Sequence, residues 1–91
     1  MGKSSENEEL EIAKQEVFRK IACILAEKTP FTLDQIKPET MLMEDADMNS
    51  LEVLLLIAEL EDTFGIRLPD EELMKIVTMA DLTEVITKQL K

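Results

Sequence analysis

The sequence predicts an all-α fold: a small four-helix bundle with three main helices, one short helix and a long first connecting loop. Apolar residues recur at helical spacing in separate stretches of the chain, and no stretch shows the alternation typical of strands. The chain has 91 residues, which suits one small domain. It is 45% hydrophobic but only 3% aromatic, so aliphatic side chains must build the core.

The first main helix is predicted from Leu10 to Lys28, where apolar residues recur every three or four positions. Pro30 ends it, because proline cannot continue a helix. Residues 1–9 are polar and acidic and are expected to form a flexible tail. The chain is therefore expected to divide into this tail and a helical domain of residues 10–91.

The long first connection follows, up to Asp47. Thr32 and Gln35 have the spacing of a capping box, which predicts a brief helical turn. Apolar residues within the connection indicate a loop folded back against the core rather than a free linker: Leu33, Ile36, Met41 and Leu42.

The second main helix is predicted from about Asn49 to Phe64. Asn49 and Glu52 have the spacing of an N-cap and its reciprocal acid, and Gly65 suits the left-handed residue just past a helix end.

A short helix is predicted from Pro69 to Ile76, with an acidic first turn. Thr78 and Asp81 then have capping-box spacing and begin the last helix. The apolar residues expected on its buried side are Leu82, Val85, Ile86 and Leu90.

The second helix has two apolar faces. The face expected to join the core consists of Val53, Leu56, Ile57, Leu60 and Phe64. The opposite face, here called the apolar strip, consists of Leu51, Leu54, Leu55 and Ala58. Three explanations for the strip remain open: the first helix packs on it, an apolar ligand lies under it, or a partner protein docks on it.

Charge limits the classes of partner. The formal net charge is −10, which disfavours nucleic acid and anionic membranes and favours basic protein surfaces. The longest apolar run, Val53 to Ala58, is far shorter than the ~20 residues that span a bilayer.

The residue types also limit the chemistry. The sequence has no histidine, which excludes imidazole bases and histidine-ligated zinc, so an enzyme is not expected and no metal site is assigned. The single cysteine, Cys23, fits a reducing compartment, with the cytoplasm as the default location. A monomer is expected.

Ser50 falls in the first turn of the second helix, with its hydroxyl pointing outward. One reading is a solvated serine with no further role. The other is an attachment point, because a phosphate ester beside free backbone N–H groups is favourable by ~0.3–1 kcal/mol.

Three segments together resemble the acyl carrier proteins: Asn49-Ser50-Leu51-Glu52, Leu60-Glu61-Asp62-Thr63-Phe64-Gly65-Ile66 and Leu68-Pro69-Asp70-Glu71-Glu72. This resemblance implies that a phosphopantetheinyl transferase moves 4′-phosphopantetheine from coenzyme A onto Ser50. The arm would then carry acyl groups as thioesters between enzymes of fatty-acid, polyketide or related lipid biosynthesis. It also implies that Leu51, Glu52, Glu61 and Asp62 meet basic patches on acyl-transferring, ketosynthase-type or ligase-type enzymes.

The chain departs from the family pattern at three positions. Asn49 stands where the family usually has an aspartate that helps hold the metal ion during arm transfer. Asp47 replaces a usual glycine, and Leu55 stands where an acidic recognition residue is common. A specialised carrier is therefore expected, whose partner-binding residues are Asn49, Leu51, Glu52, Leu54, Leu55, Ala58, Glu61 and Asp62.

Two rival interpretations remain. Asp45, Asp47 and Asn49 have the first ligand spacings of a calcium loop, although Ser50 replaces its glycine and Leu56 its bidentate glutamate, which leaves weak divalent-metal binding. The other rival is an unprimed, carrier-like adaptor that only docks other proteins.

Overall fold

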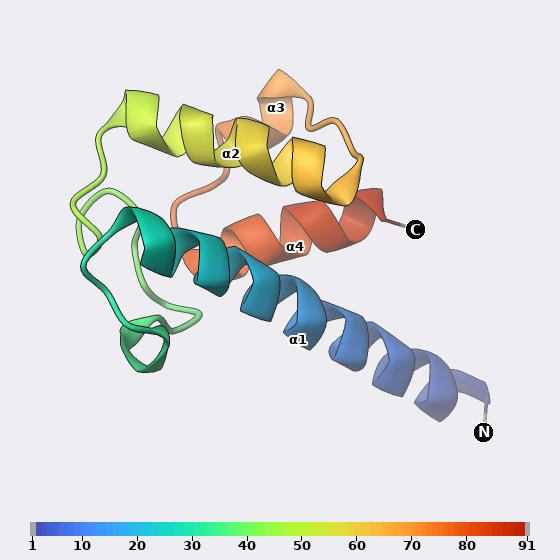
Figure 1. Ribbon diagram of the computed structural model, residues 1–91. Coiled ribbons are helices and arrows are strands. Elements are labelled where there is room, and N and C mark those ends of the chain that lie inside the picture. The colour runs from blue at the N-terminus through green and yellow to red at the C-terminus, as the bar shows by residue number, and fades with distance from the viewer. Residues whose placement is uncertain (1, 91) are drawn as a thin grey trace.

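Four helices and one 3-10 turn make up the computed structural model, which describes the backbone of residues 2–90 and the side chains of residues 8–90. In chain order these are α1 (Gly2–Lys28), η1 (Leu33–Gln35), α2 (Ser50–Phe64), α3 (Asp70–Leu73) and α4 (Met79–Gln89) (Figure 1). The predicted all-α class, with three main helices, one short helix and a long first connection, is confirmed.

Helix α1 begins at Gly2 rather than at Leu10, so its predicted start was wrong. The reason is that a helix already nucleated by the packed residues downstream can extend through residues 2–9, which contain no proline to stop it. The N-terminal part of α1 projects beyond the rest of the bundle (Figure 1). The side chains of residues 1–7 lie outside the described residues, so a flexible tail at residues 1–9 stays a prediction.

The predicted fold-back of the long loop is confirmed, since four of its apolar side chains are buried: Ile36, Leu42, Ala46 and Met48. Leu33, by contrast, is exposed. Backbone hydrogen bonds attach the loop to the start of α4. Leu42 donates its N–H to Val77 (3.0 Å), Met79 donates to Thr40 (3.0 Å) and Ala80 donates to Pro38 (2.8 Å).

Helix α4 is capped as predicted, with Thr78 Oγ1 accepting from the Asp81 N–H at 3.1 Å. Helix α3 ends at Leu73, earlier than the predicted Ile76. The Glu72 carboxylate joins α3 to α4, because it lies 3.1 Å from Lys75 Nζ and 3.4 Å from Lys88 Nζ. Hydrogen bonds from Lys75 and then Lys88 lower the pKa of Glu72 below its ordinary value.

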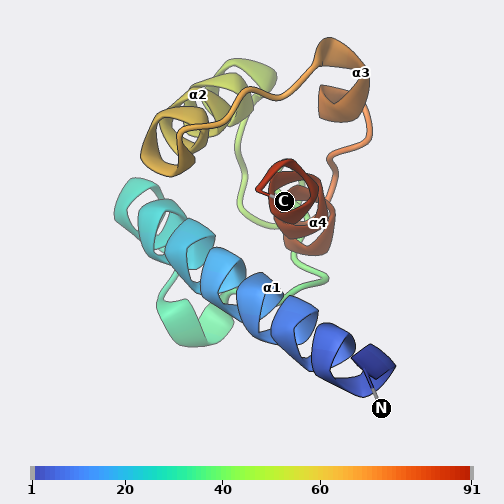
Figure 2. The same cartoon turned by 90° about the vertical axis from the view of Figure 1, so that its right-hand side faces the viewer.

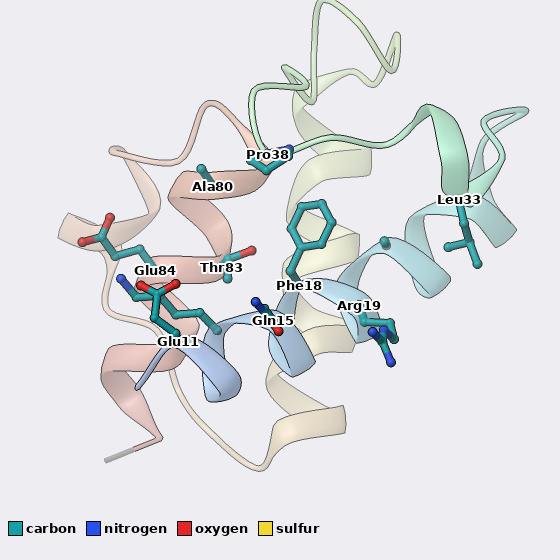
Figure 3. A pocket seen from close by; sticks show the side chains of 11 residues that line it. Glu11, Gln15, Phe18, Arg19, Leu33, Pro38, Ala80, Thr83 and Glu84 are labelled. Atoms are coloured by element: carbon teal, nitrogen blue, oxygen red, sulfur yellow. The ribbon is translucent and has the colours of Figure 1, made fainter. Parts of the chain in front are cut away.

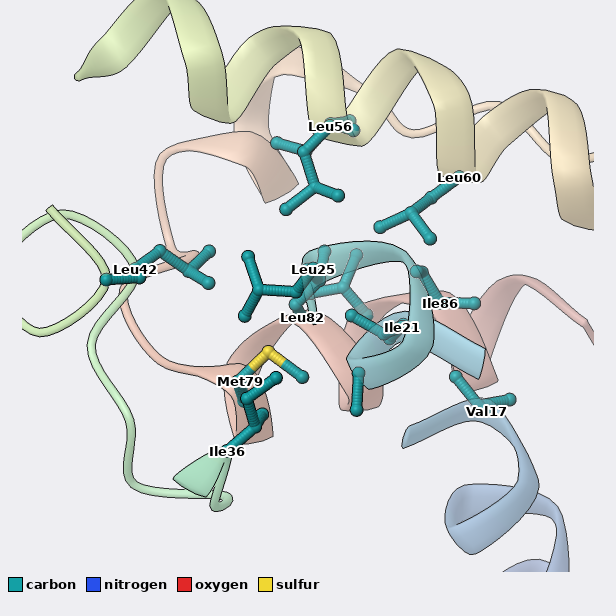
Figure 4. Packing of buried hydrophobic residues seen from close by; sticks show 14 of the residues in the cluster. Val17, Ile21, Leu25, Ile36, Leu42, Leu56, Leu60, Met79, Leu82 and Ile86 are labelled. Carbon is teal, nitrogen blue, oxygen red and sulfur yellow. The ribbon is translucent and has the colours of Figure 1, made fainter. Parts of the chain in front are cut away.

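Aliphatic side chains from every main helix form the core (Figure 4). Its fully buried large residues are Ile21, Leu25, Leu42, Leu56, Leu60, Met79, Leu82 and Ile86. Figure 2 shows α1, α2 and α3 arranged around α4. Leu90 was predicted on the buried side of the last helix, but it is exposed. It lies just beyond the end of α4, which is Gln89. No helix within residues 2–90 is long and apolar enough to cross a membrane.

Gly65 ends α2 in the left-handed conformation, with φ of 66°. Replacement by alanine is expected to lower the free energy of unfolding by about 1 kcal/mol, because an L side chain disfavours this conformation. A steric clash does not contribute, since a Cβ at this position would meet no atom within 4 Å. Chemical denaturation measures the loss, and Gly65→Asn serves as control because asparagine adopts this conformation more readily. Equal losses in both variants would contradict this explanation.

Candidate functional site

Ser50 is the first residue of α2, and its side chain is exposed. Its position is fixed by the predicted capping box. Asn49 Oδ1 accepts from the Glu52 N–H at 2.8 Å, and Glu52 Oε1 accepts from the Asn49 N–H at 2.9 Å. The Ser50 hydroxyl therefore lies at a capped helix end and is exposed to solvent.

Two backbone donors lie free beside that hydroxyl. The N–H groups of Ser50 and Leu51 donate no hydrogen bond to any described residue, whereas those of Glu52 and Val53 are bonded to Asn49. Free N–H groups at the positive end of a helix dipole favour an anion. A phosphate ester on Ser50 therefore fits this site.

The loop that leads into Ser50 is held by its own contacts. Met48 is buried and donates its N–H to the Leu42 carbonyl at 3.2 Å. Asp45 Oδ2 accepts from the Met41 N–H at 2.8 Å. Asp47 has φ of 56°, which is a left-handed conformation that glycine adopts without strain.

The structure decides how far the other helices cover the apolar strip. Leu51, Leu54 and Leu55 are 64%, 52% and 58% exposed, and Ala58 is exposed too. The first explanation, packing of the first helix on the strip, is therefore wrong. Helix α1 instead packs mainly against α4. A strip of leucines open to solvent beside Ser50 is typical of a protein-docking surface.

Acidic side chains concentrate in the same part of the chain. Residues 39–72 contain eleven carboxylates and a single basic residue, Arg67, so they carry the whole net charge of −10. Glu52 and Asp62 are exposed. Glu61 has a structural contact, because its Oε2 accepts from the Leu68 N–H at 2.7 Å. The sequence gives little sign of that contact, since the two residues lie seven positions apart.

The calcium-loop interpretation finds no support in this geometry. The carboxylate of Asp45 closes a turn on Met41, and the side chain of Asn49 caps α2. Among the described side chains, those of residues 8–90, no group of three or more histidine, cysteine, aspartate and glutamate residues could hold a metal ion.

Sequence reasoning missed a small cavity of about 160 Å³ beside the first turns of α2. Its wall combines Met41, Leu42 and Met43 from the long loop with Val53 from α2 and with Ile76 and Val77 from the segment before α4. The hydrogen bond from Leu42 to Val77 brings these distant segments together. The sequence shows that residues 41–43, 53 and 76–77 are apolar, but no local pattern in it brings these three segments together.

Three comparisons with known proteins agree. The family described as "Phosphopantetheine attachment site" matches residues 19–86. The chain is 33% identical to the acyl carrier protein of Rubrobacter xylanophilus, over 82% of this chain and 93% of that protein. It is 32% identical to the acyl carrier protein of Thermotoga maritima, over 86% of this chain and 96% of that protein.

Among solved structures, an acyl carrier protein from Enterococcus faecalis, described for its high thermal stability, superposes with a TM-score of 0.73. The two share 29% sequence identity, and the match covers 84% of this chain and 96% of that one.

Proposed function

Since the chain belongs to the acyl carrier protein family and contains a phosphopantetheine attachment site within residues 19–86, we propose that Ser50 is the residue to which this group is attached. The supporting observation is the exposure of its hydroxyl at the capped start of α2, beside two free backbone N–H groups. The acyl carrier family predicted from the sequence is thus confirmed, and the attachment residue is the proposal.

The chain itself is a carrier and not a catalyst, as expected of its family. The attached group supplies a thiol at the end of a flexible arm, which holds acyl groups as thioesters. Attachment requires Ser50 Oγ to lose its proton, and a serine hydroxyl needs a nearby base for this at neutral pH. The sequence has no histidine. We therefore expect the transferase to supply the base.

Partner enzymes are expected to dock on the start and outer face of α2. The apolar strip supplies hydrophobic contact area, and Asn49, Glu52 and Asp62 border it with polar and acidic groups. The eleven carboxylates of residues 39–72 would attract a basic enzyme surface and raise the rate of encounter. Glu61 would contribute its charge rather than a free side chain, since its carboxylate already binds Leu68.

The expected partners are a phosphopantetheinyl transferase and acyl-transferring, ketosynthase-type or ligase-type enzymes. The acyl groups would belong to fatty-acid, polyketide or related lipid biosynthesis in the cytoplasm. The small apolar cavity beside Val53 supports an apolar cargo, because it could shelter the first carbons of an acyl chain next to the arm. Asn49, Asp47 and Leu55 favour a specialised carrier with its own set of partners.

Intact mass spectrometry tests the assignment of Ser50. Incubation with coenzyme A and a broad-specificity transferase is expected to add the mass of one phosphopantetheinyl group. Ser50→Ala should abolish the gain completely, because it removes the attacking oxygen. Thr63→Ala, which removes another exposed hydroxyl from the same helix, should retain it.

A mass gain that survives in Ser50→Ala would place the arm elsewhere and overturn the assignment. If the folded wild-type protein gained no mass with any transferase, the unprimed adaptor would replace the carrier as the proposed function.

A further inference from the structure

A groove of about 630 Å³ lies between α1 and α4, beside the loop that follows η1 (Figure 3). Apolar side chains line its centre, with Phe18 and Ala22 from α1, Pro38 from the loop and Ala80 from α4. Charged side chains surround them. In Figure 3, Glu11 and Glu84 lie on one side of Phe18 and Arg19 lies on the other. No residue of α2 lines this groove, so it is separate from the candidate site at Ser50.

The groove is electrically balanced, unlike the protein as a whole. Its charged lining residues are two acids, Glu11 and Glu84, and two bases, Lys14 and Arg19. None of these four forms an ion pair within the described side chains. The protein has a net charge of −10, so two copies repel each other. Contact through this balanced groove costs less electrostatic repulsion than contact through the acidic surface of residues 39–72.

The face of α1 along the groove is complementary to itself. In an antiparallel pair of α1 helices related by a twofold axis at Gln15, each residue meets the one whose number is 30 minus its own. Glu11 then faces Arg19 of the second copy, and Ile12 faces Phe18 of the second copy. The same contacts occur twice, as in every twofold interface. These residues lie on one side of α1, because a step of about 100° per residue places all four within about 60° of Gln15.

We propose that this groove and the adjoining face of α1 form the interface of a symmetric homodimer. Ile12 is 56% exposed on α1 and does not belong to the core cluster, and the second copy would cover it with Phe18. Each Glu11 would form an ion pair with Arg19 of the other copy. The expected monomer is thereby replaced by a concentration-dependent dimer. Ser50 stays accessible in both copies, because α2 takes no part in the interface.

Charge reversal tests the pairing. Sedimentation equilibrium of the full chain, from micromolar to millimolar protein at physiological salt, is expected to show a monomer–dimer equilibrium. Glu11→Arg and Arg19→Glu should each raise the dimer dissociation constant at least about tenfold, because two ion pairs become two like-charge contacts. A reductant in every sample excludes a disulfide through the exposed Cys23.

Mixing the two variants gives the decisive result. In a heterodimer of Glu11→Arg with Arg19→Glu, opposite charges meet again at both positions, so the equimolar mixture should dimerise about as tightly as the wild type. Glu71→Arg and Arg67→Glu make the same charge changes at exposed positions outside both α1 and the groove and should leave dimerisation nearly unchanged. Thermal melts and priming of Ser50 confirm that each variant is folded.

Two outcomes would overturn the proposal. One is a wild-type protein that remains monomeric at millimolar concentration. The other is a dissociation constant that neither charge reversal raises, or that stays raised when the two variants are mixed. In either case the two copies would meet through another face. Thermal melts that show folded variants keep these outcomes distinct from simple unfolding.

Discussion

Asn49→Asp is expected to raise the rate of phosphopantetheine attachment to Ser50 by about 10- to 100-fold, the range typical for groups that support a metal site. From the resemblance to acyl carrier proteins, we expect an aspartate before the serine to help hold the metal ion during transfer. Asn49 has no carboxylate to offer, and Mg²⁺ prefers charged oxygen ligands. The fold should not change, because aspartate caps a helix as well as asparagine does. Asn49 Oδ1, which accepts from Glu52, has a direct counterpart in aspartate.

The measurement is the initial rate of mass gain over a range of Mg²⁺ concentrations, with the same transferase and coenzyme A. Gln89→Glu is the matched control, since it makes the same amide-to-carboxylate change at the end of α4, away from the start of α2 (Figure 1). An equal gain in both variants would mean that added charge alone speeds the reaction. Equal rates in the wild type and Asn49→Asp would mean that residue 49 does not limit attachment.

Leu60→Ala is expected to lower the free energy of unfolding by about 2–5 kcal/mol. The side chain of Leu60 is 0% exposed and lies in the core with Leu56 and Ile86 (Figure 4). Its removal takes apolar contact area away and leaves a cavity that the neighbouring helices cannot fully close. Because the free energy of unfolding of a small domain is only about 5–15 kcal/mol in total, the variant should be marginally stable.

Denaturant titration followed by circular dichroism measures this loss. Leu55→Ala is the matched control, as it makes the same substitution on the same helix at a side chain that is 58% exposed. Its expected change is within about 0.5 kcal/mol, because surface substitutions rarely exceed that. Similar losses at both positions would show that the apolar strip is buried in solution. A small loss at Leu55 would show that folding does not require the strip, which favours partner binding as its role.

The sequence predicted correctly those helix ends that carry a local capping signal. The caps at Asn49, Thr78 and Gly65 are where they were expected, because each depends on hydrogen bonds or backbone angles within three or four residues. The start of α1 and the end of α3 were wrong. The local sequence pattern does not fix either boundary, so small differences in helix propagation decide them.

Local patterns likewise predicted one part of the candidate site and missed another. The exposed first-turn position of Ser50 follows from the capping box alone. The contact of Glu61 with Leu68 and the cavity between residues 41–44 and 76–77 could not be read from local patterns. Both depend on how the chain after α2 returns to the long loop, and many separated side chains determine that path.

By itself, the sequence determined the helical class, the capped serine and the acidic charge around it, because local hydrogen bonding and composition are properties of neighbouring residues. Only the tertiary structure decided which face of α2 remains open, since that depends on α1 packing against α4 instead. The same packing forms the charge-balanced groove along α1. A helical pattern in the sequence shows only that a helix has an apolar face. Whether that face is buried depends on which helices, far apart in the sequence, pack against each other.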